Sequence, residues 1–99
     1  MNNVTQTIYV VDDDEAMRDS MTWLLEGEGY VVACFDSGES FLNARSAEMR
    51  GCLILDVRMP EMSGLELHEK LDALGSQLPI IFVTGHGDVP MAVSALQRG

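Results

Sequence analysis

The sequence predicts an α/β domain built on a doubly wound parallel sheet. Short, continuous apolar runs alternate with segments of helical periodicity, and the connections between them are short. Continuous apolar runs are typical of strands that are buried on both faces. Strand–helix alternation then favours a parallel sheet that is covered by helices on both sides. A further observation, acidic residues at the ends of two of these runs, indicates where a functional site lies.

The predicted elements follow one another without a linker or an internal repeat. The predicted strands cover residues 8–11, 30–35, 52–55 and 79–83, and the predicted helices cover 15–28, a short segment opened by Ser37 and Gly38, 65–74 and 89–98. Glycines follow the first and third helices, as is common at helix ends. We expect Trp23 and the methionines at helical spacing, Met17 and Met21, to lie in the core. We expect Cys34 and Cys52 to be small core residues as well.

Composition limits the classes of function. The chain has 99 residues, enough for one domain and one core, and a net charge of −10 from 6 Lys and Arg against 16 Asp and Glu. This balance argues against a direct nucleic-acid surface and against binding to anionic lipid. No apolar run is long enough to cross a bilayer, and residues 1–6 lack a signal pattern, so we predict a cytoplasmic globular protein without a membrane partner.

Four aspartates follow two of the predicted strands. Asp12, Asp13 and Asp14 close the first apolar run, and Asp56 closes the third. The carboxyl ends of parallel strands meet at one edge of a sheet, and this edge is where such sheets bind ligands. Two carboxylates about 4 Å apart repel by roughly 4 kcal/mol at an effective dielectric near 20. Such a cluster therefore indicates a bound divalent cation or a carboxylate that takes part in chemistry.

These residues suit metal-assisted phosphoryl transfer. A carboxylate such as Asp56 can attack a phosphoryl group and form an acyl phosphate. Mg²⁺ accepts one or two carboxylates, waters and phosphate oxygens. We predict that Asp13, Asp56 and the backbone oxygen of Arg58 bind the ion and that Asp12 acts through water. Thr84, at the end of the fourth strand, either donates its hydroxyl to a phosphoryl oxygen or only bonds to backbone.

Four segments resemble the receiver domain of two-component response regulators. Three of them are VVDDDE at 10–15, LDVRMPEMSG at 55–64 and VTGHGDVPMAV at 83–93. The third segment, together with FDSGESFL at 35–42, resembles the FixJ-type branch of that family. The resemblance covers essentially the whole chain.

The resemblance implies a flavodoxin-like sheet in the order 2-1-3-4-5 and a signalling role rather than an enzyme. It implies that Asp56 accepts phosphate from a phosphohistidine of a sensor histidine kinase, that Asp12 and Asp13 hold Mg²⁺, and that Thr84 reads the phosphoryl group. Reactions would be limited to the domain's own phosphorylation and dephosphorylation. Members of this branch usually carry a C-terminal helix-turn-helix domain that binds promoter DNA.

The chain departs from the family pattern at its C-terminal end. It contains no counterpart of the fifth strand and fifth helix, and no lysine follows Lys70. Residues 1–99 are thus expected to form an incomplete receiver domain with strand order 2-1-3-4 and without the effector domain. An exposed apolar edge recruits another chain, so we expect a homodimer through the fourth strand and the last helix.

Alternative interpretations remain at this point. The Asp12-x-Asp14 pattern after a strand, with a second motif at 80–84, also fits a haloacid-dehalogenase-like phosphatase, which leaves Asp56 unexplained. A flavodoxin-like binder of flavin mononucleotide is disfavoured because three successive aspartates would repel its phosphate. A single-domain protein-interaction switch is the alternative to a promoter-binding output.

Overall fold

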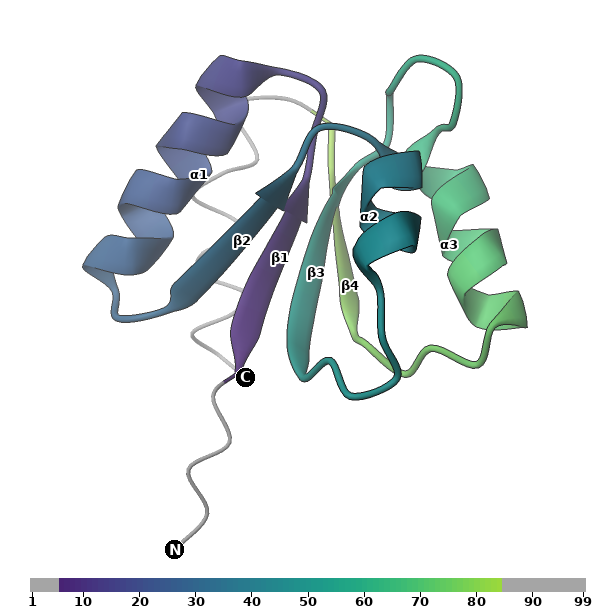
Figure 1. Ribbon diagram of the computed structural model, residues 1–99. Coiled ribbons are helices and arrows are strands. Elements are labelled where there is room, and N and C mark those ends of the chain that lie inside the picture. The colour runs from purple at the N-terminus through teal and green to yellow at the C-terminus, as the bar shows by residue number, and fades with distance from the viewer. Residues whose placement is uncertain (1–5, 85–99) are drawn as a thin grey trace, which may run out of the picture.

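The computed structural model describes residues 6–84, which form a four-stranded parallel sheet in the order β2-β1-β3-β4 with three helices (Figure 1). The elements are β1 (Thr7–Val11), α1 (Glu15–Gly27), β2 (Val31–Phe35), α2 (Gly38–Ala44), β3 (Gly51–Asp56), α3 (Gly64–Ala73) and β4 (Ile80–Val83). The predicted fold class, strand order and elements within this range are confirmed. The predicted helix over 89–98 lies outside the described residues. No helix in residues 6–84 has both the length and the apolar character to cross a bilayer.

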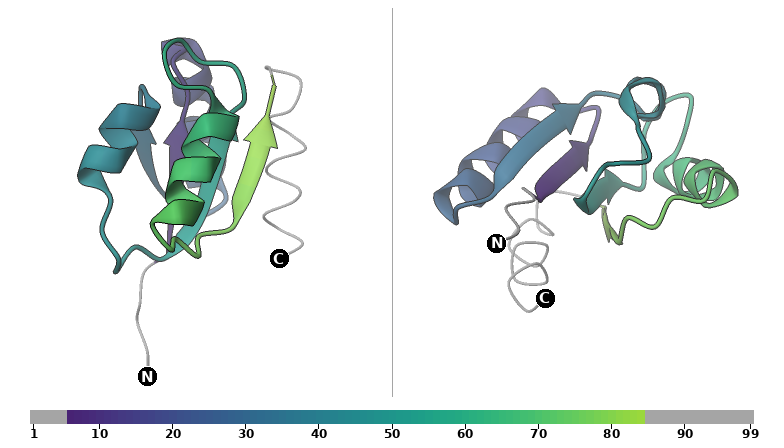
Figure 2. Two further views of the ribbon diagram at one scale, coloured as in Figure 1. Left: turned by 90° about the vertical axis from the view of Figure 1, so that its right-hand side faces the viewer. Right: turned by 60° about the horizontal axis from the view of Figure 1, so that its bottom comes forward.

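The sheet buries both of its faces. Successive strand residues point to opposite faces, so β1 contributes Ile8 and Val10 to one core and Tyr9 and Val11 to the other. Helix α1 covers the first face, while α2 and α3 lie together on the second (Figure 2). Each fully buried aliphatic or aromatic side chain stabilises the fold by about 1.5–3 kcal/mol. The continuous apolar runs in the sequence reflect this two-sided burial.

Side-chain caps determine where the helices begin. Asp14 accepts a hydrogen bond from a backbone amide in the first turn of α1, and Ser37 does the same for α2. At α3, Ser63 and Glu66 form a reciprocal capping box: the Glu66 amide donates to Ser63 Oγ at 3.1 Å, and the Ser63 amide donates to Glu66 Oε1 at 2.9 Å. Caps of this kind stabilise a helix by about 0.5–2 kcal/mol each, and they orient the loops that precede the helices.

The prediction that Trp23 lies in the core is wrong, because 77% of this side chain is exposed. Helix α1 packs through Met17, Met21 and Leu25, all of which are buried, and the predicted burial of these two methionines is confirmed. Trp23 is two residues beyond Met21, and two residues are more than half a helical turn. Trp23 therefore lies on the side of α1 opposite the buried residues Met17, Met21 and Leu25. The helix therefore turns its tryptophan toward solvent.

The core assignment of the cysteines is also wrong for Cys34, which is exposed, and only partly right for Cys52, which is half-buried. Cys34 lies on β2, an edge strand of the described sheet, and its Sγ is 3.1 Å from Thr22 Oγ1 on α1. An edge strand has a neighbour on one side only, so its side chains are covered less completely than those of β1 and β3.

Candidate functional site

Strand register brings Asp12 and Asp56 together. Val11 is paired with Leu55 across β1 and β3, so the next residues along both strands are the two aspartates. Asp13 joins them, and the three carboxylates each offer an oxygen that lies within 4.8 Å of the other two. Asp12 is buried, with 4% of its surface exposed, Asp13 is exposed and Asp56 is intermediate. We call these three residues the acidic cluster.

Backbone and side-chain hydrogen bonds hold Asp12 in place. The Asp14 amide donates to Asp12 Oδ1 at 2.9 Å, and Arg18 Nη1 donates to the Asp12 backbone carbonyl at 2.8 Å. Asp14 itself caps α1 by accepting from the Ala16 amide at 3.0 Å. Sequence reasoning missed Arg18. The available signal was that it is the only cation in α1, one turn after the cap.

The loop after β3 positions Asp56. The Arg58 amide donates to Asp56 Oδ1 at 3.1 Å, and the Gly64 amide closes the loop by donating to the Val57 carbonyl at 3.0 Å. A Cβ added to Gly64 would lie 2.2 Å from the Asp56 carbonyl oxygen. Only glycine allows α3 to begin this close to the phosphoacceptor candidate. In the sequence Gly64 is the last residue of the 55–64 segment that resembles the receiver family, and this close approach to Asp56 was not predicted.

Burial raises the pKa of Asp56 from 3.8 to about 6, and the charges of Asp12 and Asp13 act in the same direction. The hydrogen bond from the Arg58 amide opposes this rise by lowering the pKa. Burial is also the largest cause that raises the pKa of Asp12. Clustered carboxylates with raised pKa values are typical of functional sites, and a cation among their oxygens would relieve the repulsion.

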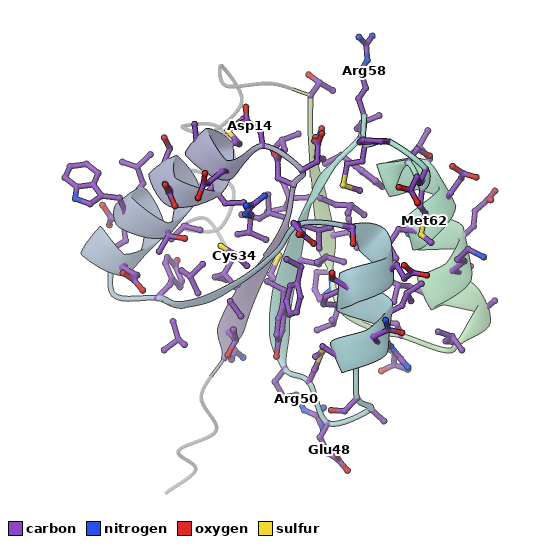
Figure 3. The ribbon with its side chains drawn as sticks, turned by 45° about the horizontal axis from the view of Figure 1, so that its top comes forward. Asp14, Cys34, Glu48, Arg50, Arg58 and Met62 are labelled. Atoms are coloured by element: carbon purple, nitrogen blue, oxygen red, sulfur yellow. The ribbon has the colours of Figure 1, made fainter. Side chains whose placement is uncertain are left out.

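The other predicted site residues lie at the same edge of the sheet. Thr84 follows β4 directly, and the carbonyl of the preceding residue, Val83, accepts from the Val57 amide at 3.0 Å. The side chain of Arg58 points outward from its loop, away from the helices (Figure 3). The rest of the VTGHGDVPMAV segment, from residue 85 on, lies outside the described residues.

Asp14 does not belong to the acidic cluster, because its carboxylate caps α1. The Asp12-x-Asp14 pattern therefore has a structural explanation that requires no phosphatase. The cluster offers three carboxylate oxygens, the ligand type that hard divalent cations prefer. The residues that are present thus fit a Mg²⁺ ion.

The parallel sheet in the order 2-1-3-4 defines a flavodoxin-like α/β domain, and the acidic cluster lies at the carboxyl edge of that sheet. The chain belongs to the response regulator receiver domain family, whose model matches residues 8–99. The family resemblance of the sequence motifs is thereby confirmed.

Known proteins support the same assignment. The response regulator protein TmoT of Ectopseudomonas mendocina is 52% identical over 99 residues, which cover 100% of this chain and 45% of TmoT. The transcriptional regulatory protein FixJ of Bradyrhizobium diazoefficiens is 49% identical over 92 residues, or 93% of this chain and 45% of FixJ. The solved structure of the response regulator StyR matches with a TM-score of 0.80 at 47% identity, over 97% of this chain and 48% of StyR. The chain thus spans about half the length of the relatives it matches.

Proposed function

We propose that the domain accepts a phosphoryl group on Asp56 in a Mg²⁺-dependent reaction and thereby switches a downstream output. The observation that supports this proposal is the acidic cluster at the carboxyl edge of the sheet, where Asp56 is half-buried beside Asp12 and Asp13. The role of the domain is signalling, in agreement with its family. Its chemistry would be limited to gain and loss of its own phosphoryl group.

The hydrogen bonds at Asp56 suggest how the reaction proceeds. Oδ1 accepts from the Arg58 amide, and we propose that the other carboxylate oxygen, Oδ2, attacks phosphorus. An O–P bond forms while the P–N bond of a phosphohistidine, or the P–O bond of an acyl phosphate, breaks and its electron pair leaves with the donor. Asp12, Asp13, Asp56 and the backbone oxygen of Arg58 would hold Mg²⁺, with Asp12 acting through water. The ion would neutralise charge between the carboxylate and the phosphoryl oxygens.

The proposed partners follow from the family. A sensor histidine kinase would supply the phosphoryl group, which implies a cytoplasmic location, and Thr84 would donate its hydroxyl to a phosphoryl oxygen in the active state. FixJ is named a transcriptional regulatory protein. For this chain we propose an output through a helix-turn-helix domain that binds promoter DNA. We also propose a homodimer formed through β4 and the helix that the sequence predicts over 89–98.

Phosphorylation on Asp56 can be tested by incubating the chain with Mg²⁺ and radiolabelled acetyl phosphate or a phosphorylated kinase. We expect label that is labile in both acid and base and is released by hydroxylamine, as an acyl phosphate is, on the unchanged chain and none on Asp56→Asn, because an amide is a poor nucleophile. Asp14→Asn is the matched control, because asparagine caps a helix as well as aspartate and position 14 lies outside the cluster. Label retained on Asp56→Asn, or mapped to Asp12, would overturn the proposal.

A further inference from the structure

A groove of about 320 Å³ opens beside the acidic cluster, between the start of α2 and the loop that follows β3. Among residues 6–84, four carboxylate residues line it and no Lys or Arg does. They are Asp13, Asp36, Glu39 and Glu61. Since Asp13 belongs both to the groove and to the acidic cluster, the groove adjoins the proposed reacting centre at this residue.

The groove combines an apolar lining with acidic side chains. Met59 and Met62 are half-buried and pack against the core under α2 and α3. Met62 lies close to the start of α2, where a Cβ added to Gly38 would meet its Sδ at 2.8 Å (Figure 3). Asp36, Glu39 and Glu61 are exposed around these methionines. The charges therefore stand at the mouth rather than in the packed interior.

We infer that this groove selects phosphoryl donors by charge. It admits a donor whose leaving group is cationic or neutral, such as a phosphorylated imidazole or amine, and it repels a donor whose leaving group is an anion. The inference rests on the proposed function, because the donor must reach Asp56. Like charges within a Debye length of about 8–10 Å repel an approaching dianion, and added salt weakens that repulsion.

The two donor classes differ in the group that leaves. With phosphoramidate, Asp56 Oδ2 bonds to phosphorus, the P–N bond breaks, and its electron pair stays on a nitrogen that already carries its protons, so ammonia departs. With acetyl phosphate the same O–P bond forms, the P–O bond breaks, and acetate departs with a negative charge. The first donor therefore meets less repulsion as it enters the groove, and no negative charge builds on its leaving group there.

The first test compares initial rates of Asp56 labelling by these two donors at low salt. The groove variant, Glu39→Gln/Glu61→Gln, removes two charges from the mouth of the groove. The matched control is Glu48→Gln/Glu69→Gln, because these two exposed acids do not line the groove. We expect the ratio of the acetyl phosphate rate to the phosphoramidate rate to be roughly 3- to 10-fold higher in the groove variant than in the unchanged chain. This increase should shrink at high salt. Equal changes for both donors, or an equal effect of the control variant, would overturn the inference.

The second test does not depend on Asp56. Met62→Cys is introduced into a Cys34→Ser/Cys52→Ala chain, and its alkylation by anionic iodoacetate is compared with alkylation by neutral iodoacetamide. Glu39→Gln/Glu61→Gln should raise the iodoacetate rate relative to iodoacetamide by roughly 3- to 10-fold. An unchanged ratio overturns charge selection. If the ratio responds while neither phosphoryl donor labels Asp56, the groove's charge selection is supported and the proposed function fails.

Discussion

At the scale of single residues, the site depends on three carboxylates that would repel one another if all were ionised. Asp12 is buried and held by two hydrogen bonds, Asp13 is exposed, and Asp56 lies between them in exposure. This difference in exposure separates the roles of the three aspartates in the proposed reaction. In that proposal Asp12 and Asp13 would hold a cation, while Asp56 would present an oxygen to an incoming phosphoryl group.

The raised pKa of Asp56 predicts how the metal-free domain responds to pH. Because its pKa rises from 3.8 to about 6 on folding, the protonated form is favoured in the folded state. The stability that Asp56 contributes is therefore fully present below about pH 4 and is lost as the pH rises through about 6. Urea unfolding of the unchanged chain and of Asp56→Asn should show a stability difference that falls between pH 4 and 7.

Saturating Mg²⁺ should reverse this trend above pH 6, because the ion binds the ionised carboxylates of the folded state. Stability profiles that run parallel for the chain and Asp56→Asn across this range would contradict the assignment of the raised pKa to Asp56.

Asp13→Ala should weaken Mn²⁺ or Mg²⁺ binding by about 10- to 100-fold, which corresponds to one lost charge-assisted contact of roughly 1.5–3 kcal/mol. Titration calorimetry measures the affinity directly. Asp14→Asn serves as the control and should bind the metal normally, since Asp14 caps α1 outside the cluster. Equal affinity in Asp13→Ala and the unchanged chain would exclude Asp13 as a ligand.

At the scale of elements, the site depends on how closely α3 approaches the end of β3. The Gly64 amide bonds to the Val57 carbonyl, and the missing side chain leaves room for the Asp56 carbonyl. The capping box of Ser63 and Glu66 then fixes the direction of α3. One short segment therefore sets both the loop that holds Asp56 and the start of the helix that covers the sheet.

Gly64→Ala should destabilise the domain by about 1–3 kcal/mol, because its Cβ would press on backbone atoms that cannot move freely. Gly27→Ala is the matched control: no atom lies within 4 Å of its added Cβ, and alanine is the better helix former, so stability should stay equal or rise by up to about 1 kcal/mol. Chemical denaturation compares the two. If both variants behave alike, the close approach at Gly64 is not a constraint.

At the scale of the whole molecule, the described sheet has β2 and β4 as its edges. Phe82 on β4 is 38% exposed. Its ring packs edge to face on the imidazole of His68 on α3, with the ring centroids 5.8 Å apart. Exposed apolar edges favour pairing with a second chain. This surface supports the proposed homodimer, and it can be tested apart from the phosphorylation site.

Phe82→Lys should reduce self-association in sedimentation experiments, because a charge on an edge strand opposes pairing between chains. Trp23→Lys is the matched control, since it replaces another exposed aromatic residue, on helix α1, which covers the opposite face of the sheet from α3. An equal effect of the two substitutions would indicate that association does not involve β4. No association at high concentration in the unchanged chain would contradict the dimer.

Much of the domain could be predicted from local patterns. Continuous apolar runs predicted the four described strands within two residues of their ends, because two-sided burial removes polar residues from a strand. The three described helices were predicted from helical periodicity, from the glycines that follow the first and third, and from Ser37 and Gly38 at the start of the second. Strand-end aspartates predicted the acidic cluster, since parallel strands bring their carboxyl ends to one edge.

The sequence by itself therefore determined the fold class and the identity of the cluster, because both depend on short-range periodicity and on residue chemistry. The tertiary structure alone decided that Trp23 faces solvent, that Arg18 holds the Asp12 carbonyl, and that Gly64 abuts Asp56. It also brought Glu39, in the first turn of α2, and Glu61, in the loop after β3, to one groove. These outcomes depend on the packing of segments far apart in the chain, which no local pattern specifies.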